Sequence, residues 1–328
     1  IELEVTKKDV LVMRIDQSTK IPATTFLRAL RGEDLRRRLE AEGVGEEDIA
    51  ADIAAVTTTE ALLREFYEVI TIKVTDLRPE HYSAAAIVDT ETGEELVGAG
   101  RQIGEAIETI TASDMKQIDV IADVSDPLIL NTMAEEKQVA IEGLEVTEHE
   151  AALLHLYARL RPGNPPQVEK ARALFVEKFF DENRYRLGKV GRFRINRKFD
   201  LNVEESEMAL RSDDFVNVVR YILDLRGQRN KAHVDDIDHL GNRRLRTLDE
   251  LAVEELRKGF LKLRRTVQEL MSVKDPDELA RVADMINRKS ISSAIEFFFG
   301  RSELSQVVDQ TNMLSMIKHE RTLSAMGP

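Results

Sequence analysis

The sequence predicts a mixed α+β protein of several domains, with short antiparallel hairpins in its first half and helices dominating its second half. Apolar and polar residues alternate in residues 1–16 and again in residues 69–74, which is the period of a β-strand. After residue 146, capping-box pairs and apolar residues three and four positions apart indicate helices. The chain has 328 residues, and 42% of them are hydrophobic. This is enough for about two or three packed domains and excludes a disordered chain.

In the first half, residues 1–16 form an expected β-hairpin around a turn at residues 6–9. A second hairpin is expected in residues 84–97, where Thr90–Gly93 separates two apolar runs. A short helix over residues 24–30 is expected to end near Gly32. Residues 33–65 are charged and rich in alanine, which predicts further helix with a break at Gly43 and Gly45.

In the second half, two capping boxes predict where helices begin. Thr147 and Glu150 open a helix to about Leu160, and Thr247 and Glu250 open a longer one. Further helices are expected at 168–180, 212–227 (capped by Ser212), 277–287 and 292–299. The Phe297–Phe299 run is expected in the core. After Gly300 the chain turns polar, which predicts a functional loop.

Composition excludes several classes of protein. The chain contains no cysteine, which excludes disulfides, thiolate metal sites and cysteine nucleophiles. No apolar run approaches the roughly 18 residues that a membrane-spanning helix needs. The net charge is −13, but residues 1–150 hold 15 basic and 33 acidic residues, so the remainder carries a net charge of +5. Such asymmetry is typical of a nucleic-acid-facing part beside an acidic, solvated part.

The densest basic segment is residues 184–198. It holds seven Lys and Arg residues and no acid, with Tyr185 and Phe193 interleaved. This composition suits neutralisation of phosphates, and we expect Arg192, Arg194 and Arg197 to contact DNA phosphate. The alternative is a solvated basic hairpin that pairs with the acidic half of the chain.

Two His and three Asp residues gather in residues 233–239. Carboxylates and imidazoles bind divalent ions, so this cluster allows a metal-dependent hydrolase built on His233, Asp235, Asp238 and His239. The spacing matches no common metal motif, however. The alternative interpretation is a loop whose aspartates orient the neighbouring arginines or accept hydrogen bonds from a base.

Three groups of segments resemble the β subunit of bacterial DNA-directed RNA polymerase. The tail is similar to that family's rifamycin-resistance region at Phe298-Phe299-Gly300, Leu304-Ser305-Gln306, Asp309-Gln310 and His319 through Pro328. Asp235–Arg244 is a near-literal match to the segment that enters the fork domain. Leu160–Gly163, Pro165-Pro166 and residues 188–198 resemble the lobe domain, as do Arg14-Ile15-Asp16 and Lys20-Ile21-Pro22.

The resemblance implies a role for several residues. Asp238 and Arg243 match a pocket that binds an unpaired guanine of non-template DNA. Gln306, Asp309, His319 and Ser324 match positions that line the RNA path and the rifamycin pocket. Thr322 stands where the family usually has an arginine in that pocket, and Val307 where an aromatic residue is common. The loss of the arginine implies weaker rifamycin binding.

The resemblance also implies an organisation and a set of partners. The expected parts are 1–32 (first part of the lobe), 33–146 (acidic lobe or insertion region), 147–232 (second part of the lobe, with the basic hairpin) and 233–328 (start of the fork). The expected partners are DNA, RNA and the β′, α, ω and sigma subunits, with transcription factors on the lobe and no membrane.

We expect a fragment in the bacterial cytoplasm, associated with the nucleoid, that positions nucleic acid in a nucleotidyltransferase without catalytic or metal-binding residues of its own. The Mg²⁺ is expected on the partner β′ subunit. The chain begins in an expected strand and stops in an expected loop, which indicates a piece of a longer protein. A third alternative is an isolated docking module for a transcription factor.

Overall fold

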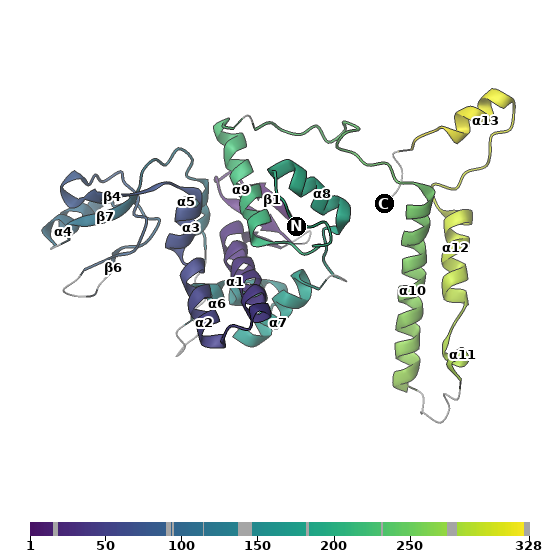
Figure 1. The fold of residues 1–328 in the computed structure, drawn as a ribbon, viewed down its shortest axis with the longest axis horizontal. Helices are drawn as coiled ribbons and strands as arrows, with labels where there is room; N and C mark the ends of the chain where they lie inside the picture. Colours follow the sequence, from purple (N-terminus) through teal and green to yellow (C-terminus); the bar gives the residue numbers. More distant parts are fainter. Residues whose placement is uncertain are drawn as a thin grey trace. The chain divides into compact units, whose positions relative to one another are not determined.

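The structure is a computed structural model that describes residues 1–15, 19–89, 93, 95–113, 115–136, 146–181, 184–230, 232–273 and 281–324. The chain divides into two compact units, Ile1–Val234 and Asp235–Pro328. We call them the first and the second unit (Figure 1). Helices with a few short antiparallel strand pairs confirm the predicted α+β class.

The first unit begins with a three-stranded antiparallel sheet of β1 (Glu2–Val5), β2 (Leu11–Arg14) and β3 (Lys20–Pro22). The predicted hairpin is confirmed, with Val5 opposite Leu11. Asp9 adopts a positive φ of 53° in the turn. Asp16 lies outside the described residues.

Three helices follow the sheet: α1 (Ala23–Glu42), α2 (Glu46–Thr57) and α3 (Thr59–Phe66). The predicted break at Gly43 and Gly45 is confirmed, since Gly43 ends α1 in a left-handed conformation. The expected helix end near Gly32 is wrong, because α1 continues through that residue. Gly32 serves a different purpose: a Cβ atom there would lie 2.3 Å from the His149 ring.

Residues 67–136 hold the small strand pairs of the first unit. The strand β4 (Val69–Lys73) was predicted, and it pairs with β7 (Gln117–Ile121). The expected second hairpin is also confirmed as β5 (Ile87–Val88) beside β6 (Glu95–Val97); most of its predicted turn lies outside the described residues. The short helices here are η1 (Val74–Asp76), η2 (Gly104–Ala106), α4 (Ile107–Ala112) and α5 (Leu128–Ala134). Buried apolar residues such as Ile110 and Val120 form a separate small core.

Four more helices complete the first unit: α6 (Glu148–Leu160), α7 (Val168–Phe179), α8 (Gly188–Phe199) and α9 (Ser212–Gly227). The predicted capping box of Thr147 and Glu150 is confirmed at α6. The prediction that Ser212 caps α9 is wrong, because Arg211 occupies the capping position. The Ser212 hydroxyl instead donates to the buried Asp34 carboxylate at 2.8 Å.

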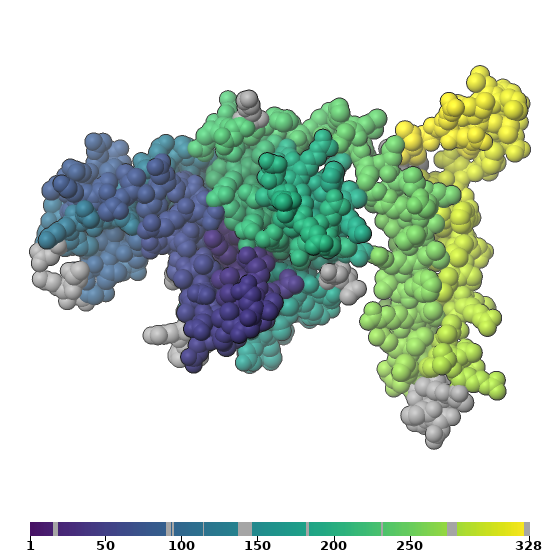
Figure 2. Space-filling model, viewed as in Figure 1, coloured from purple at the N-terminus to yellow at the C-terminus, as the bar shows by residue number. Residues whose placement is uncertain are grey.

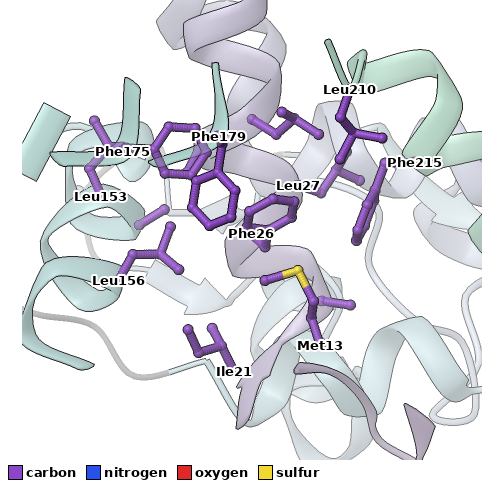
Figure 3. Packing of buried hydrophobic residues seen from close by; sticks show 14 of the residues in the cluster. Met13, Ile21, Phe26, Leu27, Leu153, Leu156, Phe175, Phe179, Leu210 and Phe215 are labelled. Atoms are coloured by element: carbon purple, nitrogen blue, oxygen red, sulfur yellow. The ribbon is translucent and has the colours of Figure 1, made fainter. Parts of the chain in front are cut away.

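A cluster of aromatic rings lies at the centre of the first unit (Figure 3). Phe26 of α1 contacts Phe179 of α7 and Phe215 of α9, with ring centroids 5.1 and 5.3 Å apart. Met13 and Ile21 come from the sheet and Leu153 and Leu156 from α6. The cluster therefore joins the first strands to helices that lie about 200 residues later in the sequence.

The second unit contains α10 (Leu248–Val273), α11 (Val282–Met285), α12 (Lys289–Arg301) and α13 (Met313–Glu320). Helix α10 packs against α12, and their side chains are in contact (Figure 2). The close approach depends on Gly259, where a Cβ atom would lie 3.2 Å from Cβ of Ala294. The helices predicted after residue 273 are present with shifted ends, and part of the first lies outside the described residues.

Two expectations for the second unit are wrong. The segment after Gly300 is not wholly a loop, because α13 forms within it. Only Phe298 of the Phe297–Phe299 run is buried, whereas Phe297 and Phe299 are more than half exposed. Successive side chains of a helix point about 100° apart, so a single helix face cannot bury three neighbouring residues.

Candidate nucleic-acid interface

The loop before α10 is held by its own hydrogen bonds rather than by a core. The backbone carbonyl of His239 accepts from the amides of Asn242 and Arg243 at 2.8 and 3.1 Å. The Asn242 side chain donates to the carbonyl of Asp236 at 2.7 Å, and the Asp236 carboxylate accepts from the Asp238 amide at 2.9 Å. These bonds make a compact turn that presents its side chains to solvent.

Asp238 and Arg243, which the sequence predicts to act together, form an ion pair in this turn. Nη1 of Arg243 lies 3.3 Å from Oδ1 of Asp238, and the side chains are 52% and 80% exposed. An exposed pair of this kind contributes at most about 1 kcal/mol. A carboxylate has about four acceptor sites and a guanidinium five N–H donors. One mutual contact therefore leaves both groups further hydrogen-bonding capacity for a ligand.

The next two arginines of the loop bind α10 instead. Arg244 binds the Glu250 carboxylate, and Arg246 lies 3.2 Å from Glu254. The Arg244 guanidinium lowers the pKa of Glu250. Glu250, which was expected to close a capping box, thus fixes the loop to the first turns of the helix. The arginine run separates into one residue that faces Asp238 and two that anchor the loop.

The predicted residues of the tail lie around α13. Asp309 accepts hydrogen bonds from the amide and hydroxyl of Thr311 at 3.3 and 3.0 Å. These bonds lower the pKa of Asp309. Gln306 precedes α13 in the sequence and Ser324 follows it, and both residues are exposed.

Helix α13 begins with a capping box. Asn312 accepts from the Ser315 amide at 2.8 Å, and its own amide donates to the Ser315 hydroxyl at 3.1 Å. This box was not predicted, because the tail was interpreted as a loop. The signal was available in the sequence as a capping residue three positions before a polar side chain that can close the box.

The basic segment forms helix α8 rather than the expected hairpin. Gly188 begins it with a φ of 70°, a conformation that favours glycine. Arg194 and Arg197 are exposed on this helix.

The position of Arg192 in the structure contradicts its predicted role in phosphate binding. Its side chain is fully buried and bound to Asp214, and it also donates to the backbone carbonyls of Glu207 and Ala209. A guanidinium satisfied inside the protein cannot neutralise DNA phosphate, so Arg192 serves the fold.

The exposed face of α8 adds two residues that sequence reasoning did not assign. Lys189 is exposed, and the Phe193 side chain is 49% exposed. Residues 189, 193 and 197 are spaced by four, which places them on one helix face. This spacing is informative only once the segment is known to be helical.

The hydrolase alternative is not supported. Among the residues that the structure describes, no three His, Asp or Glu side chains come close enough to share a metal ion. Asp238 pairs with Arg243, and the ring of His239 accepts the Gly241 amide at 3.0 Å. Over the same described ranges, no helix has the length and apolar character to cross a membrane.

Comparison with known proteins decides the family. Residues 112–246 match the family described as RNA polymerase Rpb2, domain 2. The whole chain is 51% identical over 338 aligned positions to the DNA-directed RNA polymerase subunit beta of Rhodopirellula baltica, and it covers 25% of that protein. The chain belongs to the RNA polymerase β-subunit family.

Other β-subunit relatives are more distant. That of Anaeromyxobacter sp. (strain Fw109-5) is 33% identical over 384 positions, with 100% of this chain and 26% of the relative covered. That of Leptospira biflexa is 32% identical over 344 positions, with 100% of this chain and 25% of the relative covered. The chain spans about a quarter of the length of the β-subunit relatives it matches, and the family inferred from its motifs is confirmed.

Proposed function

We propose that the chain positions nucleic acid within DNA-directed RNA polymerase, as a part of its β subunit. The main support for this proposal is the 51% identity to the β subunit of Rhodopirellula baltica, which extends over the whole chain. The exposed Asp238–Arg243 pair supports the proposal, because it presents a strong acceptor and a strong donor at one point of a preformed turn. In this role the chain contributes no catalytic residue to the nucleotidyltransferase.

The Asp238–Arg243 pair is assigned to an unpaired guanine of the non-template strand. Guanine carries N–H donors on its Watson–Crick edge and the acceptors O6 and N7. The Asp238 carboxylate accepts from the donors, and the Arg243 guanidinium donates to the acceptors. Other bases present a different pattern, so the pair discriminates guanine at the stage when the strand is separated.

The residues around α13 are assigned to the RNA path. Gln306, His319 and Ser324 supply donors for RNA phosphate or sugar oxygens. Asp309 keeps its negative charge because its pKa is lowered, so it repels phosphate and accepts instead from hydroxyl groups, either the ribose 2′-OH or an inhibitor hydroxyl. These same residues form the rifamycin pocket in this proposal.

The partners follow from membership of the family. We propose DNA, RNA and the β′, α, ω and sigma subunits as partners, with transcription factors on the lobe. The Mg²⁺ of the reaction belongs to the β′ subunit in this scheme. The setting is the bacterial cytoplasm at the nucleoid.

The guanine assignment is tested in the assembled polymerase with the Asp238→Ala variant. Open complexes are compared on templates that differ only in one unpaired non-template base. The variant is expected to lose its preference for guanine by about 5- to 100-fold, the range of one good base contact, while elongation continues. The matched control is Asp284→Ala, an exposed acid on α11 of the same unit. An unaltered guanine preference in Asp238→Ala contradicts the assignment.

A further inference from the structure

Helix α8 separates its basic side chains onto two faces. On the inner face, Arg192 binds Asp214, and the Asn196 side chain donates to the Val203 carbonyl at 2.6 Å. Phe199 packs edge-on against the Tyr221 ring with centroids 6.0 Å apart. These contacts hold the helix in one rotational setting, which determines what its other face presents to solvent.

The outer face combines positive charge with an exposed aromatic ring. Lys189 and Arg197 are exposed and separated by eight residues, about 12 Å along the helix axis. Between them lie Val190 and Phe193, which are 44% and 49% exposed. The helix contains no acidic residue from Gly188 to Phe199. We refer to Lys189, Val190, Phe193, Arg194 and Arg197 as the α8 outer face.

Binding of phosphates would explain the cations of this face but not the exposed aromatic ring of Phe193. The other aromatic residue of the basic segment, Tyr185, packs against Phe179 with centroids 6.3 Å apart, and burial raises its pKa. Tyr185 therefore belongs to the core, whereas Phe193 exposes its ring among cations. An exposed aromatic ring beside cations is the usual construction of a single-strand binding site, since bases stack on the ring while cations bind the backbone.

We propose that the α8 outer face binds single-stranded nucleic acid, with an unpaired base stacked on Phe193 and the flanking phosphates on Lys189 and Arg197. This inference rests on the proposed function. It adds Phe193 as a binding residue and specifies that the bound nucleic acid is single-stranded. Duplex DNA offers phosphates but no free base face, so duplex binding gains from the cations and not from Phe193.

A protein partner fits the same face less well. A stable protein interface buries roughly 800 Å² on each partner around an apolar centre. The apolar part of the α8 outer face consists of two partly exposed side chains. One stacked base needs only one ring, which matches the size of the apolar part.

The test uses the full chain, which contains no tryptophan. Phe193→Trp places a single fluorescent ring at the proposed stacking position. The probe is a 20-nucleotide single-stranded DNA, compared with the same sequence as a duplex and with polyglutamate. We expect the single strand to quench the tryptophan emission and the duplex to quench it far less. The matched control is Ile70→Trp on β4, where the wild-type side chain is 41% exposed; its emission is expected not to change.

Affinity measurements complete the test. Phe193→Ala is expected to weaken single-strand binding by about 5- to 100-fold and duplex binding by less than about twofold. Lys189→Ala/Arg197→Ala is expected to weaken both and to reduce the salt dependence of binding.

The stacking inference is overturned if Phe193→Ala changes neither affinity, if it changes both equally, or if polyglutamate quenches the Phe193→Trp emission as strongly as DNA. In that case, a loss of nucleic-acid affinity in the double variant Lys189→Ala/Arg197→Ala still supports phosphate binding by these two residues. An absence of any nucleic-acid binding at low salt overturns both the phosphate role and the stacking.

Discussion

Arg192 and Asp214 form a completely buried ion pair, with Nη1 of the arginine 2.7 and 2.8 Å from the two carboxylate oxygens. The side chains are 0% and 1% exposed. The same Asp214 carboxylate accepts the Arg211 amide at 3.0 Å, at the first turn of α9. The pair therefore joins α8 to the beginning of α9 and gives the α8 outer face its orientation.

Breaking this pair should strongly destabilise the first unit. Arg192→Ala leaves Asp214 buried without its guanidinium, which typically costs about 3–5 kcal/mol. Urea denaturation followed by circular dichroism measures the free energy of unfolding. Arg197→Ala, on the exposed face of the same helix, is the control and should change stability by less than about 0.5 kcal/mol. A loss below about 1 kcal/mol in Arg192→Ala would show that the pair is not a structural anchor.

Gly32→Ala should also destabilise the protein, although alanine favours a helix. A Cβ atom at this position would lie 2.3 Å from Nδ1 of His149. The ring of His149 contacts the Arg28 carbonyl at 3.1 Å and Glu33 at 3.3 Å, so its displacement breaks both contacts. Overpacking of this kind costs about 1–3 kcal/mol, measured as a lower midpoint in thermal unfolding.

The control for Gly32→Ala is Gly300→Ala in α12, where an added Cβ atom meets nothing within 4 Å. This substitution should be neutral or stabilising by up to about 1 kcal/mol, the helix preference of alanine over glycine. If both substitutions stabilise the protein, the packing of His149 against Gly32 is looser than the structure indicates.

Tyr67 should make stability depend on pH in the alkaline range. Its hydroxyl donates to the Asp126 carbonyl at 2.6 Å, and burial raises the pKa of Tyr67 to about 12. The unfolded pKa is about 10, so the folded state holds the proton more tightly. The stabilisation is fully present below about pH 10 and is lost as the pH rises through about 12, with a total on the order of 2 kcal/mol.

Comparison with Tyr67→Phe isolates this contribution from that of the other groups that titrate at high pH. The variant cannot ionise at this position, so its free energy of unfolding should fall less steeply between pH 10 and pH 12. Near neutral pH it should be about 1 kcal/mol less stable because the hydrogen bond is missing. Parallel pH profiles for the two proteins would argue against a buried, titrating Tyr67.

Thr322→Arg should increase rifamycin affinity if the tail forms the proposed pocket. Thr322 follows α13, and its hydroxyl donates to the Lys318 carbonyl at 2.8 Å, so it caps the helix end. An arginine at this position supplies a charged donor, worth roughly ten- to a hundredfold in affinity. Inhibition of the assembled polymerase measures the effect. Thr322→Met, similar in length but uncharged, is the control; equal inhibition of both variants would rule out a donor effect.

Much of the fold could be predicted because the deciding signals are local. The strand alternation before Asp9, the capping box at Thr147 and the break at Gly43 each depend on a few neighbouring residues, and the structure confirms all three. An error occurred where a glycine has a tertiary purpose. Gly32 was predicted to end a helix, yet α1 continues through it, and the missing side chain leaves room for the His149 ring.

The sequence by itself determined the α+β class and the family, because these depend on motifs and short-range spacing. Only the tertiary structure decided which charges face inward. Arg192 and Arg194 are two residues apart with identical chemistry, yet one is buried against Asp214 and the other is exposed. The difference arises because burial of a charge requires a partner from another segment, and α9 brings that partner from 22 residues away.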